Sequence, residues 1–376
     1  MRVLERCDAL GAISEEPGRL VRRFATPAMR EAHALAAGWM REAGLDTRED
    51  AVGNLIGTRG EPVVSFGSHL DTVVDAGRYD GPLGVVAGIE VADRLRDVPL
   101  EVISFADEEG VRFGTSFLGS SAMAGTFDVA QLRWTDADGV RLGDLVGDPA
   151  DAARDDVRAY VELHIEQGPV LERAGAAVGV VTTITGQTNA ELTFTGEAGH
   201  AGTVPMDARR DALAAAAAFV LAAEARGGDG LVATVGQLAV APGARNVIPG
   251  AATLSLDVRH VDDATRRAAA EDLHAEARRI VAARGVELAW ELRGETEAVP
   301  TDPDLRRRLE AAVGGDVMRL ASGAGHDGVA MSAIAPVAML FVRCERGISH
   351  NPAEAVDAAD VAVALDVLER FVRQLA

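Results

Sequence analysis

The sequence predicts a two-domain α/β protein, and three observations support the prediction. The chain has 376 residues, which exceeds the roughly 250 to 300 residues at which a single hydrophobic core stops growing. Both ends of the chain alternate apolar runs at helical spacing with short β-rich runs, whereas the middle follows a different order. We therefore expect one layered domain built from both ends of the chain, with a second domain inserted between them.

The elements of the first domain follow from the spacing of its apolar residues. Helical spacing predicts helices at 30–43, 84–95 and 358–375. Short runs rich in valine, isoleucine and phenylalanine predict strands at 63–66, 100–105, 317–320 and 337–342. Because these elements lie on both sides of the middle segment, we assign residues 1–181 and 295–376 to one domain.

The middle segment has the order of a ferredoxin-like sandwich. Its pattern predicts strands at 190–195, 231–239, 251–260 and 286–292, and helices at 210–226 and 263–284. The resulting order, βαββαβ, is that of antiparallel strands covered by two helices. We place this inserted domain at residues 182–294.

Composition and charge exclude several classes of function. The formal net charge is −21, which repels phosphate backbones and anionic lipid surfaces, so nucleic acid and membrane are not expected as partners. All 37 basic residues are arginines. Without lysine, the chain has no residue for a Schiff base, for pyridoxal phosphate or for the phosphate-binding loop of nucleotide hydrolases.

The cysteines and the first residues of the chain favour the cytoplasm. Cys7 and Cys344 are too few and too far apart for a disulfide framework, and the sequence assigns neither a role. The first six residues mix charges and lack the apolar stretch of a secretion signal. We expect a cytoplasmic protein.

Histidine and acidic residues follow the predicted strands of the first domain. His69 follows the strand 63–66 directly, at the carboxyl end where α/β domains place their sites. Asp71 is placed to accept a hydrogen bond from that imidazole. Three adjacent acids at 107–109 follow the strand 100–105, and divalent cations would remove the cost of holding them together.

The other candidate residues indicate a metal site only when they are considered together. Taken alone, Asp80 is better explained as the cap of the helix that follows it, and the acids at 107–109 can form a solvated turn. Together, His69, His164 and His350 with Asp80 and Glu109 form an imidazole and carboxylate set suited to two divalent ions. Glu108 is left over as a candidate general base.

Eight segments, in this order, resemble the M20 metallopeptidase clan. They are GSHLDTV at 67–73, YDGPLG at 79–84, DEEG at 107–110, ELHIEQGP at 162–169, AGHAGTVPM at 198–206, RNVIPG at 245–250, SGAGHD at 322–327 and GISHNPAE at 347–354. The resemblance covers nearly the whole chain and points to the amidohydrolase branch, which contains N-carbamoyl-L-amino acid hydrolases, β-ureidopropionases and allantoate amidohydrolases. It implies a catalytic α/β domain with an inserted lid and dimerisation domain.

The resemblance also implies a role for each residue of the set. One metal ion would be held by His69, Asp80 and His164, and the other by Asp80, Glu109 and His350, with Asp80 bridging. Glu108 would be the base that activates water. His164 resembles the carbamoyl-hydrolysing branch, because peptidase members generally have a carboxylate there. The sequence does not separate zinc from manganese, and cobalt or nickel suits the same donors.

For the inserted domain, the resemblance implies substrate contacts and a homodimer. His200, Asn246 and Arg259 would contact the substrate, and His200 would reach the site of a partner chain. Arg259 offers a planar fork for a carboxylate, Asn246 an amide for a ureido group, and His200 a donor for a developing oxyanion. Without the resemblance, Arg259 is better explained as an exposed ion pair and Asn246 as a turn residue. Gln167 and His326 also match substrate-side positions.

The expected function is that of a dinuclear metal amidohydrolase acting on a small carboxylate with a ureido group, releasing ammonia and carbon dioxide. Segments at 15–18 and 24–29 resemble chains of the allantoate type, which favours allantoate over an N-carbamoyl-L-amino acid or β-ureidopropionate. One alternative is a peptidase or deacylase of the same clan, for which His164, Gln167 and Asn246 are the wrong set. The other is a non-catalytic dimeric binding protein, which would be expected to have lost Glu108 or a ligand.

Overall fold

The computed structural model describes residues 1–376, and the chain forms two compact units. Unit 1 comprises Met1–Ile184 and Thr301–Ala376, and unit 2 comprises Thr185–Pro300. Unit 1 is therefore built from both ends of the chain, while unit 2 is one continuous segment. No helix in either unit is long and apolar enough to cross a membrane.

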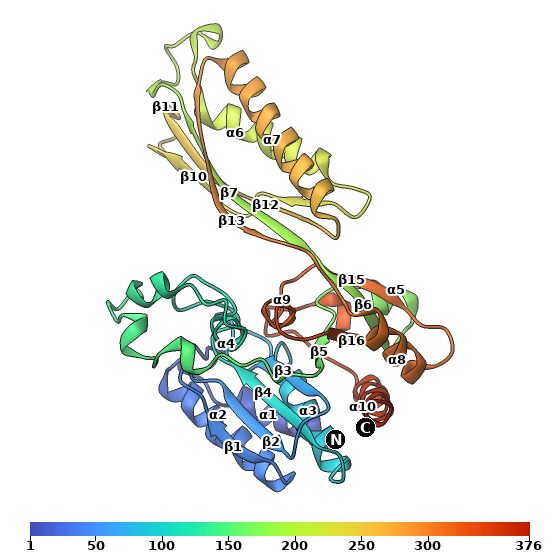
Figure 1. Cartoon of the computed structure of the whole chain (residues 1–376). Coiled ribbons are helices and arrows are strands. Elements are labelled where there is room, and N and C mark those ends of the chain that lie inside the picture. Colours follow the sequence, from blue (N-terminus) through green and yellow to red (C-terminus); the bar gives the residue numbers. More distant parts are fainter. The chain divides into compact units, whose positions relative to one another are not determined.

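A mixed β-sheet forms the centre of unit 1 (Figure 1). Its strands are β1 (Asp46–Glu49), β2 (Leu55–Arg59), β3 (Ser65–His69), β4 (Leu100–Phe105), β5 (Tyr160–Ile165), β6 (Val178–Ile184), β15 (Arg319–Ser322) and β16 (Val337–Val342). They lie in the order β1-β2-β4-β3-β5-β16-β6, and β15 pairs with β6. The central pairs β4–β3, β3–β5 and β5–β16 are parallel, so the carboxyl ends of these strands meet at one edge.

Helices cover both faces of this sheet. One face carries α1 (Arg2–Gly11), α2 (Pro27–Glu42), α3 (Pro82–Arg94), α8 (Pro303–Val313) and α10 (Ala358–Arg373), and the other carries α4 (Leu118–Met123) and α9 (Gly328–Met331) (Figure 1). A short helix, α5 (Val170–Ala174), follows β5, and 3₁₀ turns lie at 129–133, 142–144, 149–151 and 345–347. Because both faces are covered, β3, β4, β5 and β16 are buried along their whole length.

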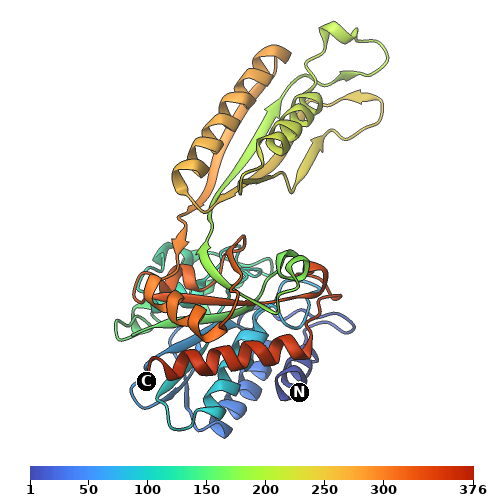
Figure 2. The same cartoon turned by 90° about the vertical axis from the view of Figure 1, so that its right-hand side faces the viewer.

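Unit 2 is an antiparallel sheet with two helices on one face. Its strands are β7 (Gly186–Thr195), β9 (Val232–Thr234), β10 (Leu238–Ala241), β12 (Ala251–His260) and β13 (Glu287–Thr296). They lie in the order β10-β12-β7-β13, with β9 also on β12, and α6 (Ala212–Arg226) and α7 (Asp263–Arg284) cover one face (Figure 2). The unit also contains the pair β8 (Gly199–His200) and β11 (Val247–Ile248), a 3₁₀ turn at 206–208, and the short strand β14 (Val299–Pro300). This arrangement confirms the predicted α/β class with a smaller antiparallel βαββαβ unit.

One predicted strand of unit 2 is wrong in detail. The sequence predicts a single strand at 231–239, whereas the structure has β9 and β10 separated by Val235–Gln237. Both strands pair with β12, so these three residues lie opposite only two, Ser255 and Leu256, and form a β-bulge. The Ser255 hydroxyl accepts a hydrogen bond from Gln237 N at 3.0 Å, which fixes the bulge.

Close packing of α3 on the sheet makes a testable difference between two helical glycines. At Gly84 in α3, a Cβ would lie 2.3 Å from the Leu163 carbonyl oxygen, whereas at Gly38 in α2 it would meet no atom within 4 Å. Alanine favours a helix over glycine by about 1 kcal/mol, so Gly38→Ala should raise the melting temperature. Gly84→Ala should lower it, because overpacking costs about 1 to 3 kcal/mol. Thermal unfolding of both variants checks this, and equal melting temperatures would contradict the close contact.

Candidate metal centre

The carboxyl ends of three parallel strands bring four predicted residues together. β3 ends at His69, and His164 is the last but one residue of β5. Glu108 and Glu109 follow the end of β4. Because β4, β3 and β5 are parallel neighbours, these ends meet at one edge of the sheet, where α/β folds bind ligands.

Asp80, just before α3, lies between two groups of donors. Its Oδ1 is 3.0 Å from His164 Nε2 and 3.8 Å from His69 Nε2. Its Oδ2 is 3.4 Å from the Nε2 of His350, which also lies 3.5 Å from Glu109 Oε1. One group consists of Asp80, His69 and His164, and the other consists of Asp80, Glu109 and His350. Within each group the donor atoms lie within 4.8 Å of one another. A single carboxylate thus presents a different oxygen to each group.

The donor chemistry fits two divalent ions. Imidazole nitrogen and carboxylate oxygen together suit borderline cations such as Zn²⁺ and Mn²⁺. His69 Nδ1 lies 3.0 Å from the main-chain oxygen of Asp71, and His164 Nδ1 lies 3.0 Å from that of Ile165. With each Nδ1–H donating to a carbonyl, each Nε2 faces Asp80. In the neutral imidazole the Nε2 lone pair is available to a metal ion, and a bound ion would displace the proton that His164 Nε2 shares with Asp80 in the ion-free protein.

The charges at this edge favour a bound cation. Burial and the charge of Glu109 raise the pKa of Glu108 well above its usual range, and burial and Asp80 raise the pKa of Glu109 to about 9. Burial alone would also raise the pKa of Asp80, but the charge and hydrogen bond of His164 hold it below its usual range. Burial opposes the charged form of His164, yet Asp80 raises the pKa of that imidazole to about 9. A divalent ion would relieve the repulsion among these acids.

Glu108 is close to the cluster without completing either group around Asp80. It is 7% exposed, and its Oε2 lies 3.7 Å from His69 Nε2. Its carboxylate also lies within 4.8 Å of donor atoms of His69 and Glu109. The side chain is therefore within reach of a molecule held at the cluster.

Asp71 acts through different atoms from those predicted. The acceptor for His69 Nδ1 is the main-chain oxygen of Asp71, while its carboxylate Oδ1 lies 3.7 Å away. That carboxylate instead accepts hydrogen bonds from Glu108 N at 3.2 Å and from Glu109 N at 3.0 Å. Asp71 therefore fixes the turn that carries both glutamates.

Two side chains hold the second oxygen of Asp80. Gln167, predicted on the substrate side, donates from Nε2 to Asp80 Oδ2 at 2.8 Å. The hydroxyl of Ser349 donates to the same oxygen. The sequence analysis missed Ser349, although its place beside His350 in the segment 347–354 was an available signal.

His326 lies beside His164 in the interior of unit 1. The two ring centroids are 4.6 Å apart, and His326 Nε2 is 2.8 Å from Ser322 Oγ. Burial and the charge of His164 lower the pKa of His326 well below its usual range, so the ring is neutral near pH 7. A neutral imidazole has one donor and one acceptor nitrogen.

The other predicted substrate residues belong to unit 2. His200 lies in β8 opposite Val247, and its Nδ1 accepts a hydrogen bond from Gly202 N at 3.1 Å. The main-chain oxygen of Asn246 accepts from Ala201 N at 3.0 Å, so His200 and Asn246 belong to neighbouring segments. Arg259, on β12, makes a two-point ion pair with Asp257 at 2.7 and 2.9 Å.

Comparison with known proteins assigns the chain to a family. Residues 65–374 match the family described as Peptidase family M20/M25/M40. The chain belongs to this family. It is 39% identical to allantoate deiminase from Arabidopsis thaliana, over 98% of this chain and 81% of that protein. It is 42% identical to N-carbamoyl-L-amino acid amidohydrolase from Geobacillus stearothermophilus, over 100% of this chain and 98% of that protein.

A solved structure places the chain within a branch of the M20 family. An amidase of the hydantoinase/carbamoylase family from Burkholderia multivorans matches with a TM-score of 0.91 and 35% identity, covering 100% of this chain and 97% of that one. The predicted family and branch are therefore confirmed. With the cluster around Asp80, the chain is a metal-dependent hydrolase of the allantoate and N-carbamoyl amino acid type.

The ion-free M20 protein is expected to lose stability as the pH rises from 7 to 9. Glu109 and His164 both have a folded-state pKa of about 9, above the ordinary values of 4.5 and 6.5. A group whose pKa is raised by folding stabilises the protein fully below its unfolded pKa, and this contribution is lost as the pH rises through the folded pKa. The free energy of unfolding should therefore fall, by up to about 1.4 kcal/mol per pH unit for each group.

Urea unfolding at pH 7, 8 and 9, with and without Zn²⁺, measures this dependence. His69 and His326, whose pKa values are lowered mainly by burial, change charge on unfolding only near pH 6.5 and below, outside this window. Because ligands bind ions in deprotonated form, Zn²⁺ should stabilise the protein more at pH 9 than at pH 7. Glu109→Gln removes one of the groups with a raised pKa and should make the ion-free slope less steep. A stability that rises between pH 7 and 9 without ions would contradict the assignment.

Proposed function

We propose that this M20 protein hydrolyses allantoate and releases ammonia and carbon dioxide from one of its ureido groups. The observation that carries the proposal is the glutamate pair at 108–109. Glu109 completes a donor group with Asp80 and His350, while Glu108 lies buried beside them and belongs to neither group around Asp80. A carboxylate beside the donor groups that is not itself a member of them can serve as the general base of a hydrolysis. The relatives named for allantoate and N-carbamoyl amino acids support a ureido group as the one attacked.

In this mechanism the residues of unit 1 move and hold protons. Two bound divalent ions would polarise the ureido carbonyl and lower the pKa of water. Glu108 accepts the proton of the attacking water and returns it to the departing amine. Gln167 and Ser349 keep the Asp80 carboxylate oriented through their hydrogen bonds to its Oδ2.

We assign the recognition of the substrate to His200, Asn246 and Arg259 of unit 2 and to His326 of unit 1. Arg259 binds the substrate carboxylate. In the structure Asp257 holds the Nε and one terminal nitrogen of this guanidinium, so the substrate must displace or share this ion pair. Asn246 pairs with the ureido group, and His200 donates to the oxyanion that develops on its carbonyl. His326, as a neutral imidazole, supplies one further hydrogen bond.

A second substrate is favoured by one finding. The N-carbamoyl-L-amino acid amidohydrolase from Geobacillus stearothermophilus is 42% identical over the whole of this chain. An N-carbamoyl-L-amino acid also joins a carboxylate to a ureido group, so the same residues would bind it and Glu108 would serve the same step.

A panel of substrates tests the proposed activity. Zn²⁺- or Mn²⁺-loaded protein is incubated with allantoate, N-carbamoyl-L-amino acids, β-ureidopropionate and dipeptides, and ammonia and free amine are measured. We expect ammonia release with the highest kcat/KM on allantoate, and no activity after chelation. A higher kcat/KM on N-carbamoyl-L-amino acids would replace allantoate by the second substrate. Cleavage of dipeptides alone, or full activity in chelated protein, would contradict the proposal.

We further propose a homodimer formed through unit 2. The edge strands β9 and β10 expose Val232 and Leu238, which are 54% and 46% exposed. An apolar strand edge is a template for pairing with a second chain. Leu221 on α6 and Leu292 on β13 add exposed apolar surface to the same unit. In this dimer, His200 of one chain acts in the site of the other.

Mixing two inactive variants tests this dimer. Glu108→Gln should lower turnover by about 10²- to 10⁴-fold while the chain still binds two ions, because Glu108 is not a ligand in this mechanism. His200→Ala should lower turnover by removing the oxyanion donor. A mixed dimer of the two variants has one site with both defects and one with neither. Random pairing of equal amounts should therefore restore about a quarter of wild-type activity per chain, since symmetric dimers have two equivalent sites.

The control mixes Glu108→Gln chains with chains that carry both Glu108→Gln and His200→Ala. Every site in that mixture lacks Glu108, so no activity should be recovered. Subunit exchange is verified with differently tagged chains. Fully exchanged Glu108→Gln and His200→Ala chains without recovered activity would show that His200 does not act in the partner's site. If Glu108→Gln bound fewer ions per chain than wild type, Glu108 would be a metal ligand.

A further inference from the structure

The two loops that meet at Asp80 are joined by a buried glutamate. One loop, residues 70–81, leads from β3 to α3 and carries Asp80, and we call it the Asp80 loop. The other, residues 345–355, follows β16 and carries His350, and we call it the His350 loop. Its ends are held together by a hydrogen bond from Glu345 N to Ala355 O at 2.8 Å. Glu354, near the end of this loop, is only 3% exposed.

The carboxylate of Glu354 binds the main chain of the Asp80 loop. Its Oε1 accepts hydrogen bonds from Tyr79 N at 2.7 Å and from Asp80 N at 3.1 Å. These contacts join residues 275 and 274 positions apart in sequence. Two main-chain donors, one at Tyr79 and one at Asp80, are thus satisfied by one side-chain oxygen from the His350 loop.

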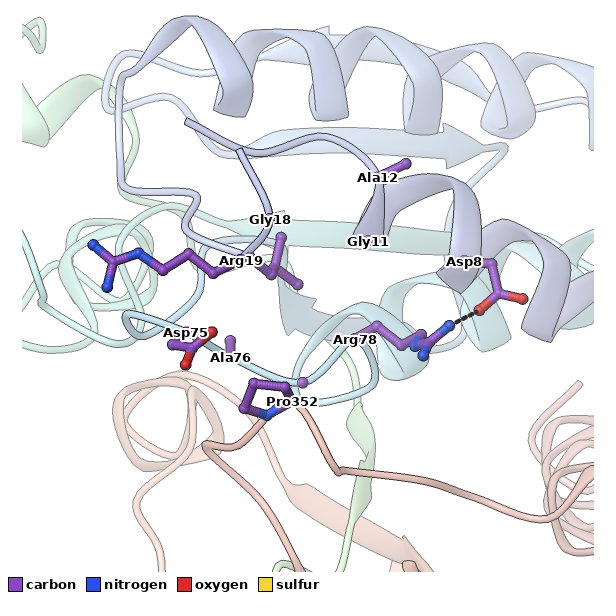
Figure 3. A pocket seen from close by; sticks show the side chains of 11 residues that line it. Asp8, Gly11, Ala12, Gly18, Arg19, Asp75, Ala76, Arg78 and Pro352 are labelled. Atoms are coloured by element: carbon purple, nitrogen blue, oxygen red, sulfur yellow. Dashed lines mark hydrogen bonds and ion pairs between the residues drawn. The ribbon is translucent and has the colours of Figure 1, made fainter. Parts of the chain in front are cut away.

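The Asp80 loop makes room for this side chain. A Cβ at Gly77 would lie 2.3 Å from Glu354 Cδ and 2.4 Å from its Cβ. The backbone of Gly77 does not have the positive φ that would itself exclude a side chain. Gly77 also lines a cavity of about 360 Å³ together with Ala76 and Pro352, which are labelled in Figure 3. The absence of a side chain at Gly77 is therefore explained by the presence of Glu354.

His350 depends on this loop more than the other histidines depend on theirs. His69 and His164 lie in buried strands, whereas His350 has a half-exposed side chain and a backbone φ of +54°. Such a conformation persists in a residue other than glycine only when its surroundings hold it in place. The contacts on either side of it are those of Ser349 with Asp80 Oδ2 and of Glu354 with the main chain of Asp80.

We propose that Glu354 is a positioning residue that clamps the His350 loop onto Asp80 and thereby assembles the second ion site. That site consists of Asp80, Glu109 and His350, and the inference rests on the dinuclear centre of the proposed function. The first site shares Asp80 but takes its other two ligands, His69 and His164, from buried strands, so it depends less on the clamp. Loss of Glu354 should therefore weaken the second ion more than the first.

The test compares Glu354→Ala with Glu354→Gln. Alanine removes the acceptor, whereas the amide oxygen of glutamine can still accept both main-chain N–H groups. Zn²⁺ is titrated against a competing chelator, and bound ions per chain and the affinity of each step are measured. We expect two ions in wild type and in Glu354→Gln. In Glu354→Ala the second ion should bind about 10- to 100-fold more weakly, and kcat should fall with its occupancy.

A matched control separates positioning from a general loss of stability. Asp302 also accepts two main-chain hydrogen bonds, from Asp304 N and Leu305 N at 2.9 Å each, where α8 begins. Asp302→Ala should lower the melting temperature and leave both zinc affinities unchanged. Gly77→Ala keeps the Glu354 carboxylate but displaces it, so it should weaken the second ion as Glu354→Ala does. If Glu354→Ala does not fold, the zinc affinities of Gly77→Ala still test the proposal.

Three results would overturn the inference. If wild type binds two ions and the affinity for the second ion is unchanged in both Glu354→Ala and Gly77→Ala, Glu354 does not position the second site. The proposed function would be unaffected by that result. Weak second-ion binding in Glu354→Gln would show that the two hydrogen bonds are not what holds the site. Fewer than two Zn²⁺ in wild type would overturn the dinuclear centre and the clamp together.

Discussion

The burial of several carboxylates at one edge of a sheet is the constraint on which the rest of unit 1 depends. Asp71, Asp80 and Glu108 are each less than a tenth exposed, and Glu109 lies beside them. A buried charge costs several kcal/mol unless it is paired. Main-chain N–H groups compensate Asp71, and His164 compensates Asp80, but the two glutamates have high pKa values without a cation. Metal binding is therefore coupled to the stability of this edge.

Asp80 connects two sites that the fold builds in different ways. His69 and His164 are 2% and 1% exposed and lie on neighbouring parallel strands, so their positions are set by the ladder of the sheet. His350 is half exposed on a loop, and it reaches Asp80 through contacts of its neighbours along the chain. Because strands fix His69 and His164 and a loop fixes His350, the donor group that contains His69 and His164 is the one that the fold holds more firmly.

The sequence predicts the fold, and it names the residues that the structure gathers around Asp80, because both leave local signals. Runs of buried residues mark the strands, and the residues that follow a parallel strand, such as His69 and Glu108, necessarily meet at its carboxyl edge. The positioning contacts leave no such signal. Glu354 binds Tyr79 across 275 positions, and the carboxylate of Asp71 binds two amides rather than the imidazole two residues before it. The bulge at 235–237 likewise depends on pairing with β12.

The charge of the chain implies how an anionic substrate must be recognised. With a formal net charge of −21 and no lysine, the surface repels a carboxylate at long range, although salt limits this effect to about 8 Å. Recognition of the proposed carboxylate substrate therefore depends on groups in direct contact, namely arginines and any ions held at the cluster around Asp80. Relatives 39% and 42% identical carry the names of different substrates. A shared set of ligands can prepare the same ureido carbonyl in both, so the choice between substrates lies with residues that meet the rest of the molecule, outside the metal ligands.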